Sequence, residues 1–201
     1  MRKAFYLLFL MAFAFSISAE ERKAPELAFN LPGQGQKLLS QYRGKVVGLE
    51  FILTTCPHCQ AQSKVMTKFQ NEFAGKGFQA LDLAINLLDN GGTAESANSA
   101  ATMFSQKFEV GFPVGWLPRE QMMAFEGFSL MDRMVVPQLV LIDRKGVIRY
   151  STPAGSGPEW EAQMNEAALH QHIEELVNET APKSTARTLR QKSTHVASVA
   201  K

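Results

Sequence analysis

The chain of 201 residues contains only two cysteines, Cys56 and Cys59. This scarcity excludes a framework of several structural disulfides, and a bond between two such close cysteines would close too small a loop to stabilise the fold much. A zinc site is disfavoured because it normally needs four ligands, and the histidines His170, His172 and His195 lie far along the chain. We therefore expect the two cysteines to serve chemistry.

The chain also lacks a large excess of charge, since its formal net charge is +2. Acidic residues outnumber basic ones once the two basic ends are set aside, so nothing in the charge suggests a nucleic-acid partner. Residues 181–201 carry basic residues, no acid and little apolar content. This composition predicts a solvated, disordered tail, with weak contact to an anionic membrane surface as the alternative.

Apolar runs long enough to span a bilayer, roughly 20 residues, are missing as well. The run Ala4–Phe15 follows Arg2 and Lys3 and leads into small residues up to Ala19, which is typical of a cleaved secretory signal. We predict that residues 1–19 are a signal peptide and that the protein is exported, to the periplasm or another extracytoplasmic space. An uncleaved membrane anchor is the alternative, whereas the lack of a following cysteine argues against a lipid anchor.

Strand-like and helix-like apolar patterns alternate along the remaining chain. Strands are expected at residues 46–53, 78–85, 138–143 and 147–150, and helices from the cysteines to residue 73, at 93–108, at 119–125 and at 158–177. Parallel strands need crossover helices, and the closing hairpin adds an antiparallel pair. The order predicts one α/β domain, residues 20–180, with a central mixed sheet flanked by helices.

The spacing Cys56-Pro57-His58-Cys59 at a predicted helix start suits a reversible disulfide. Thr55 is expected to cap this helix, and Pro57 fits and stiffens its first turn. Positions i and i+3 share one face there, so the two α-carbons can approach within the roughly 4.4–6.8 Å that a disulfide tolerates.

The two cysteines are expected to play different parts. Cys56 lies at the helix N-terminus, where partial positive charge stabilises a thiolate, and is the predicted nucleophile. Cys59, one turn further, is expected to be buried and to resolve the mixed disulfide. His58 would stabilise the thiolate further and make the disulfide more oxidising; the alternative is an exposed helix residue without a redox role.

Several segments, in this order, resemble the redoxin branch of the thioredoxin superfamily. They are Ala24-Pro25, Tyr42–Val47, Cys56–Cys59 and Val136–Gly146. The resemblance is to TlpA/ResA-like exported disulfide reductases, close to the AhpC/TSA group. It covers about residues 24–177 and implies a thioredoxin-like fold.

The resemblance also implies roles for residues outside the cysteine pair. The bond Val136–Pro137 would be cis and would face the disulfide, leaving the Val136 backbone free to pair with a substrate strand. Glu50 would be a buried carboxylate beneath Cys59, with a raised pKa, and would accept the proton of that thiol. We expect Met134 near the substrate groove, because methionine suits adaptable apolar surfaces.

Two departures from the reductase pattern leave the direction of electron flow open. Thr55 stands where these reductases usually have Trp, and the dipeptide Pro57-His58 resembles that of DsbA-type oxidases. Peroxide reduction is disfavoured because Leu49 and Leu53 stand where the peroxidatic motif has Pro and Thr.

The sequence therefore predicts an exported thiol-disulfide oxidoreductase that exchanges a disulfide between Cys56–Cys59 and protein substrates. It would need no cofactor, would be recycled by a redox partner and would act as a monomer. A Cu(I) chaperone, because thiolates select Cu(I), and a redox-inert binding module on the same fold remain as alternatives.

Overall fold

The computed structural model describes residues 22–129 and 131–179. The predictions for the signal peptide 1–19 and for the tail 181–201 lie outside these residues. Within the described part, no helix is both long and apolar enough to cross a membrane.

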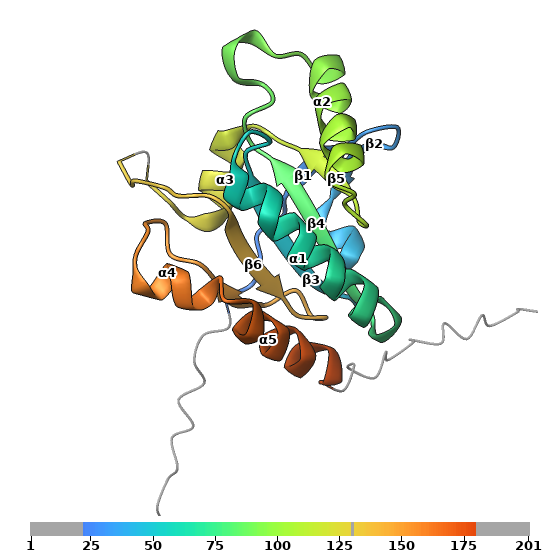
Figure 1. Cartoon of the computed structure of the whole chain (residues 1–201), viewed down its shortest axis with the longest axis vertical. Helices are drawn as coiled ribbons and strands as arrows, with labels where there is room; N and C mark the ends of the chain where they lie inside the picture. The colour runs from blue at the N-terminus through green and yellow to red at the C-terminus, as the bar shows by residue number, and fades with distance from the viewer. Residues whose placement is uncertain (1–21, 130, 180–201) are drawn as a thin grey trace, which may run out of the picture.

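A mixed sheet of seven strands, in the order β2-β1-β5-β4-β3-β6-β7, forms the centre of the fold (Figure 1). The strands are β1 (Ala28–Leu31), β2 (Gly35–Leu38), β3 (Val46–Ile52), β4 (Phe78–Ala84), β5 (Val114–Trp116), β6 (Gln138–Ile142) and β7 (Ile148–Ser151). β3, β4 and β5 run parallel, whereas β1, β6 and β7 pair antiparallel with their neighbours. The predicted thioredoxin-like α/β fold is thereby confirmed.

Helices cover both faces of this sheet. They are α1 (Pro57–Phe73), α2 (Ala94–Lys107), α3 (Arg119–Glu126), α4 (Pro158–Gln163) and α5 (Glu166–Asn178), with 3₁₀ turns η1 (Leu39–Tyr42), η2 (Ala74–Lys76) and η3 (Asp89–Gly91). Helices α1, α2 and α5 pack on one face, and α3 with the segment around β1 and η1 packs on the other (Figure 1). The sheet therefore separates two apolar cores.

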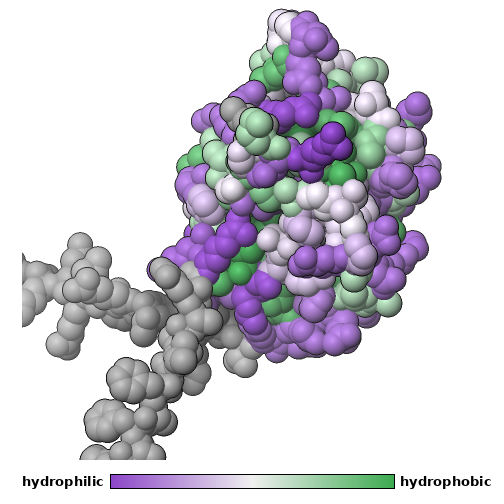
Figure 2. Space-filling view, turned by 90° about the vertical axis from the view of Figure 1, so that its left-hand side faces the viewer, coloured by the Kyte–Doolittle hydropathy of each residue, from purple (hydrophilic) through white to green (hydrophobic). Residues whose placement is uncertain are grey.

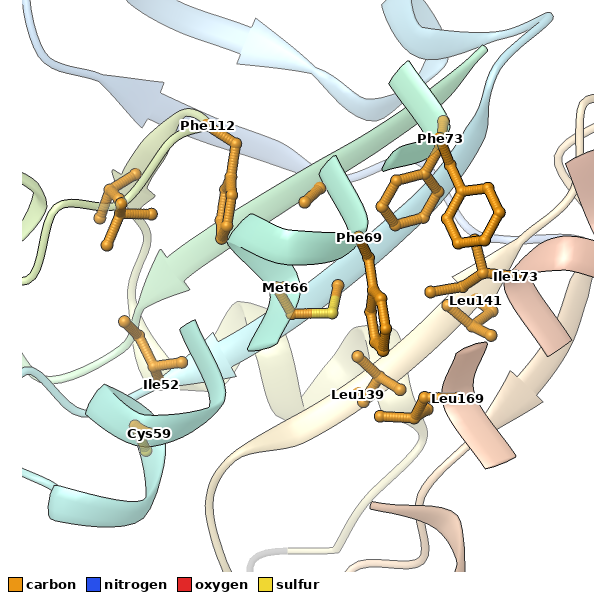
Figure 3. Packing of buried hydrophobic residues seen from close by; sticks show 14 of the residues in the cluster. Ile52, Cys59, Met66, Phe69, Phe73, Phe112, Leu139, Leu141, Leu169 and Ile173 are labelled. Atoms are coloured by element: carbon orange, nitrogen blue, oxygen red, sulfur yellow. The ribbon is translucent and has the colours of Figure 1, made fainter. Parts of the chain in front are cut away.

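Strand β3 is buried along its whole length, as its apolar sequence predicts. Its side chains alternate between the two cores: Val46 and Ile52 belong to the core under α1, whereas Leu49 and Phe51 belong to the core beside α3. Met66 and Phe69 of α1 reach down toward the sheet and α5, as Figure 3 shows. The outer surface in Figure 2 is mainly hydrophilic, with small separate apolar patches.

Two local predictions were wrong. The expected last helix is two helices, because Asn165 interrupts it and caps α5 by accepting the N–H groups of Ala167 and Ala168. Strand β2 (Gly35–Leu38) was not expected, since its short sequence GQKL has no strand-like apolar pattern; it forms by pairing with β1.

The close approach of β5 to β1 generates a prediction about stability. A Cβ atom on Gly115 would lie 2.6 Å from the backbone oxygen of Asn30 and 2.8 Å from Cδ2 of Leu31. We expect Gly115→Ala to lower the free energy of unfolding by about 1–3 kcal/mol, because backbone must move to relieve the overlap. Urea unfolding measures this loss.

Gly75→Ala is the matched control, since nothing lies within 4 Å of the added methyl group. It should leave the free energy of unfolding unchanged or raise it by about 0.4–1 kcal/mol through lower entropy of the unfolded chain. Equal unfolding midpoints for the two variants would contradict this account of the β1–β5 contact.

Candidate redox site

Cys56 is the N-cap residue of α1. Its Sγ accepts the backbone N–H of Cys59 at 3.3 Å, and Pro57 follows in the first turn as predicted. The expected cap, Thr55, was wrong by one residue, because the sulfur itself takes the free N–H at the helix start. A donor aimed at this sulfur, together with the helix N-terminus, stabilises negative charge there.

The two thiols differ sharply in exposure. Both cysteines are free thiols; Cys56 is half-buried, whereas Cys59 is fully buried. Burial raises the pKa of the Cys59 thiol above its ordinary value, and the hydrogen bond with Cys56 raises it further. The predicted burial of the second cysteine is confirmed, and Figure 3 shows Cys59 at the edge of the core under α1.

Polar side chains fix the loop that leads into Cys56. The amide of Asn86 accepts the Thr54 N–H at 3.2 Å and donates to its Oγ1 at 3.3 Å. Gln60 donates to the Thr54 carbonyl at 3.0 Å. Sequence reasoning missed Asn86 and Gln60. The one signal for Asn86 was a polar residue directly after the strand expected at residues 78–85.

The peptide bond Val136–Pro137 is cis, as the resemblance implies. The carbonyl of Val136 lies 3.8 Å from the Sγ of Cys56, so the predicted approach of this loop to the cysteines is confirmed. Among the described residues, the N–H of Val136 has no hydrogen-bond partner. A short length of backbone beside Cys56 is thus open to a further strand.

Two side chains that sequence reasoning did not assign to the site hold this loop. Gln138 donates to the Val135 carbonyl at 2.7 Å and to both carbonyls of residues 153–154 at 3.2 Å. Trp160 of α4 donates from Nε1 to the Pro137 carbonyl at 3.3 Å. The only sequence signal for Trp160 was its place in the helix expected at residues 158–177.

The positions of His58 and Met134 do not test the roles predicted for them. His58 is exposed on the first turn of α1. Met134 is half-buried and packs, together with Val136, against the core beside α3. The tuning role of His58 and the substrate-binding role of Met134 stay predictions.

Glu50 is buried in the middle of β3, on the face that α1 covers. Burial raises its pKa well above the ordinary value, and the neighbouring Asp82 raises it further. Glu50 in turn contributes to the raised pKa of Cys59. The expected burial and raised pKa are confirmed, whereas transfer of a proton from Cys59 stays a prediction. Asp82 was recognised only as a polar interruption of its strand.

An open hollow of about 520 Å³ lies on the other side of the cysteine loop. Thr54 and Thr55 form one edge, and Met103, Phe104 and Phe108 give it an apolar wall. Met103 is 59% exposed. A bulky apolar group would have space beside Thr54 and Thr55, the residues that precede Cys56.

Comparison with known proteins agrees with this geometry. The AhpC/TSA family matches residues 21–151. The "Thioredoxin-like protein YneN" of Bacillus subtilis (strain 168) is 26% identical over 131 residues, which is 65% of this chain and 69% of that protein.

Solved structures give the same picture. A crystal structure from Chlorobium tepidum, assigned as the thiol:disulfide interchange protein DsbE, is 27% identical, with a TM-score of 0.59 over 78% of this chain and 96% of that one. A solution structure from Bacteroides thetaiotaomicron, assigned as a protein disulfide isomerase, is 25% identical, with a TM-score of 0.59 over 81% and 92%. With its thioredoxin-like fold and a family match over more than half of its length, the chain belongs to the AhpC/TSA family.

Proposed function

We propose that this protein is an exported, TlpA-like thiol-disulfide oxidoreductase that exchanges a disulfide between Cys56–Cys59 and protein substrates. The relatives assigned as a thiol:disulfide interchange protein, a protein disulfide isomerase and a thioredoxin-like protein support a redox function in general. The observation that carries the proposal is the position of the Cys56 sulfur, between the N–H of Cys59 and the carbonyl of Val136. Export is inferred from the sequence of residues 1–19.

Reduction of a substrate would take two exchanges. The thiolate of Cys56 attacks one sulfur of the substrate disulfide, and the other sulfur leaves as a thiolate. Cys59 then loses its proton and attacks the Cys56 sulfur, which releases the second substrate thiolate and leaves a Cys56–Cys59 disulfide. The same steps in reverse oxidise a substrate dithiol, so the reduction potential of the pair decides the direction.

The cis-proline loop supplies the means to bind a protein chain. An extended substrate segment can add to the Val136 backbone as a further strand, pairing with its free N–H and, in place of the Cys56 thiol, with its carbonyl. Such pairing places a substrate sulfur beside Cys56 and recognises the backbone of the substrate more than its side chains. Recognition of many different polypeptides follows from this arrangement.

The Cu(I) chaperone keeps its place as the second candidate because the two sulfurs lie close together at the helix start. Among residues 22–129 and 131–179, no cluster of three or more His, Cys, Asp or Glu side chains is arranged to hold a metal ion. Cu(I) binding without thiol exchange would favour this function.

The unequal exposure of the two thiols predicts unequal labelling. When the reduced protein is treated with iodoacetamide at neutral pH, we expect Cys56 to react at least about tenfold faster than Cys59, since alkylation needs an accessible thiolate. Mass spectrometry of the digested protein measures both rates. In denaturant the rates should become equal, and faster labelling of Cys59 in the folded protein would contradict the assignment of the nucleophile.

The two-step exchange predicts different defects for the two cysteine variants. In an insulin-reduction assay with dithiothreitol, Cys56→Ser should abolish the rate above background. When the reduced Cys59→Ser variant is mixed with insulin after dithiothreitol has been removed, it should instead accumulate a mixed disulfide between Cys56 and the substrate, because the resolving thiol is missing. Non-reducing gels and mass spectrometry detect that species.

Thr102→Ser, an exposed change on α2 that keeps the hydroxyl, is the control and should retain the full rate. Turnover that survives Cys56→Ser would overturn the proposed function.

A further inference from the structure

Two acidic side chains lie next to each other inside the core under α1. Glu50 of β3 and Asp82 of β4 are direct partners in the parallel register, and both are fully buried. Neighbouring strands are about 4.8 Å apart, and paired residues project to the same face of the sheet. The two carboxyl groups are therefore close neighbours beneath α1.

Hydrogen bonds satisfy only part of this pair. Ser63 of α1 donates to Oδ2 of Asp82 at 2.6 Å. Among the described residues, Oδ1 of Asp82 and both oxygens of Glu50 have no hydrogen-bond partner. The amide of Gln62, also without a partner there, lies close enough to lower the pKa of Glu50 somewhat.

No described cation faces the two carboxyl groups. From α1 the titratable group beside them is the Cys59 thiol, whose pKa Glu50 raises, with Cys56 at the helix start. The other elements of this core contribute uncharged side chains: Val114 and Trp116 from β5, Leu139 and Leu141 from β6, Ala97, Ala101 and Phe104 from α2, and Leu169 and Ile173 from α5. Two negative charges side by side would thus be uncompensated.

We propose that Glu50 and Asp82 act as one carboxylate pair that shares a single proton, and that Asp82 thereby sets the pH at which the pair can accept the proton of Cys59. The inference rests on the proposed function and adds a positioning residue to it. Asp82 acts through Glu50, and Ser63 holds Asp82 in its ionised form.

The carboxylate pair takes up the proton that Cys59 must lose in the resolving step. Cys59 gives its proton to Glu50 once that carboxyl group is ionised, and its sulfur attacks the Cys56 sulfur of the mixed disulfide. The bond from Cys56 to the substrate sulfur breaks, the substrate leaves as a thiolate, and that thiolate takes a proton from solvent. One disulfide is reduced and one is formed, so no further oxidant or reductant is needed.

The directions of the pKa shifts agree with a shared proton. Burial, and then the charge of Asp82, raises the pKa of Glu50 well above its ordinary value. Burial raises the pKa of Asp82 to about 7, although the Ser63 hydrogen bond opposes this rise. Near pH 7 the pair therefore keeps a proton on Glu50, and Glu50 can accept the Cys59 proton only once its own proton is lost at higher pH.

Titration of the carboxyl groups in the reduced full chain tests the pair without using its activity. Side-chain ¹³C shifts followed against pH should show that Asp82→Asn lowers the midpoint of Glu50 by at least about one unit, because the neighbouring charge is gone. Ser63→Ala should move the Asp82 midpoint upward, because a hydrogen bond to the ionised form is lost. Glu126→Gln removes a buried carboxyl beside the other core and should leave both midpoints unchanged.

A rate measurement links the pair to the chemistry. Cys56 is first loaded with 5-thio-2-nitrobenzoate, and release of that group by Cys59 is followed against pH. The pH of half-maximal release should fall in Asp82→Asn by about the same amount as the Glu50 midpoint. Glu126→Gln should keep the wild-type profile.

The outcomes separate this inference from the proposed function. An unshifted Glu50 midpoint in Asp82→Asn would overturn the pair even if protein disulfides are exchanged normally. Displaced midpoints in a protein that exchanges no disulfide would overturn the proposed function and leave the pair standing. If Asp82→Asn does not fold, the titration midpoint of Asp82 in Ser63→Ala becomes the deciding measurement. If that midpoint does not rise, the roles assigned to Ser63 and Asp82 are overturned.

Discussion

The packing of α1 on strands β3 and β4 is the interaction on which the rest of this structure depends. β3 is buried on both faces, so its position is fixed by two apolar cores at once. The chain leaves β3 through three residues and enters α1 at Cys56, whose sulfur occupies the cap position. Burial of the strand thus fixes the position of the half-buried Cys56 sulfur, and the strand itself carries Glu50 on the face under α1, where Cys59 is buried.

Much of this arrangement could be predicted from sequence. The apolar run of β3, the helix start at the cysteines and the closing hairpin each have strong local patterns, which is why the fold and the pair Cys56–Cys59 could be identified. The N-cap at Cys56 and the helix break at Asn165 could not be predicted, because several nearby polar residues could also cap or interrupt a helix. Asp82 was missed for another reason: only strand register shows that it lies opposite Glu50.

Residues from distant parts of the chain shape the site around the two sulfurs. Asn86 fixes the loop before Cys56, and Gln138 with Trp160 fixes the loop that contains the cis-proline. None of them carries chemistry of its own. Their shared function is to hold backbone groups in place, and contacts between side chain and distant backbone leave no periodic signal in a sequence. Membership of the AhpC/TSA family accounts for the overall fold, whereas these contacts set the local shape of the two loops beside the cysteines.

The sheet divides the interior into two cores, and substitutions in these cores have different effects. The core beside α3, with Leu49 and Phe51, touches neither sulfur, whereas the core under α1 contains Cys59 itself. Substitutions on the α3 side, away from Met134 and Val136, can therefore alter the stability of the fold with little effect on the surroundings of the two sulfurs. The stability of the fold and the environment of the two thiols can vary separately, because they depend on two cores that lie on opposite faces of β3.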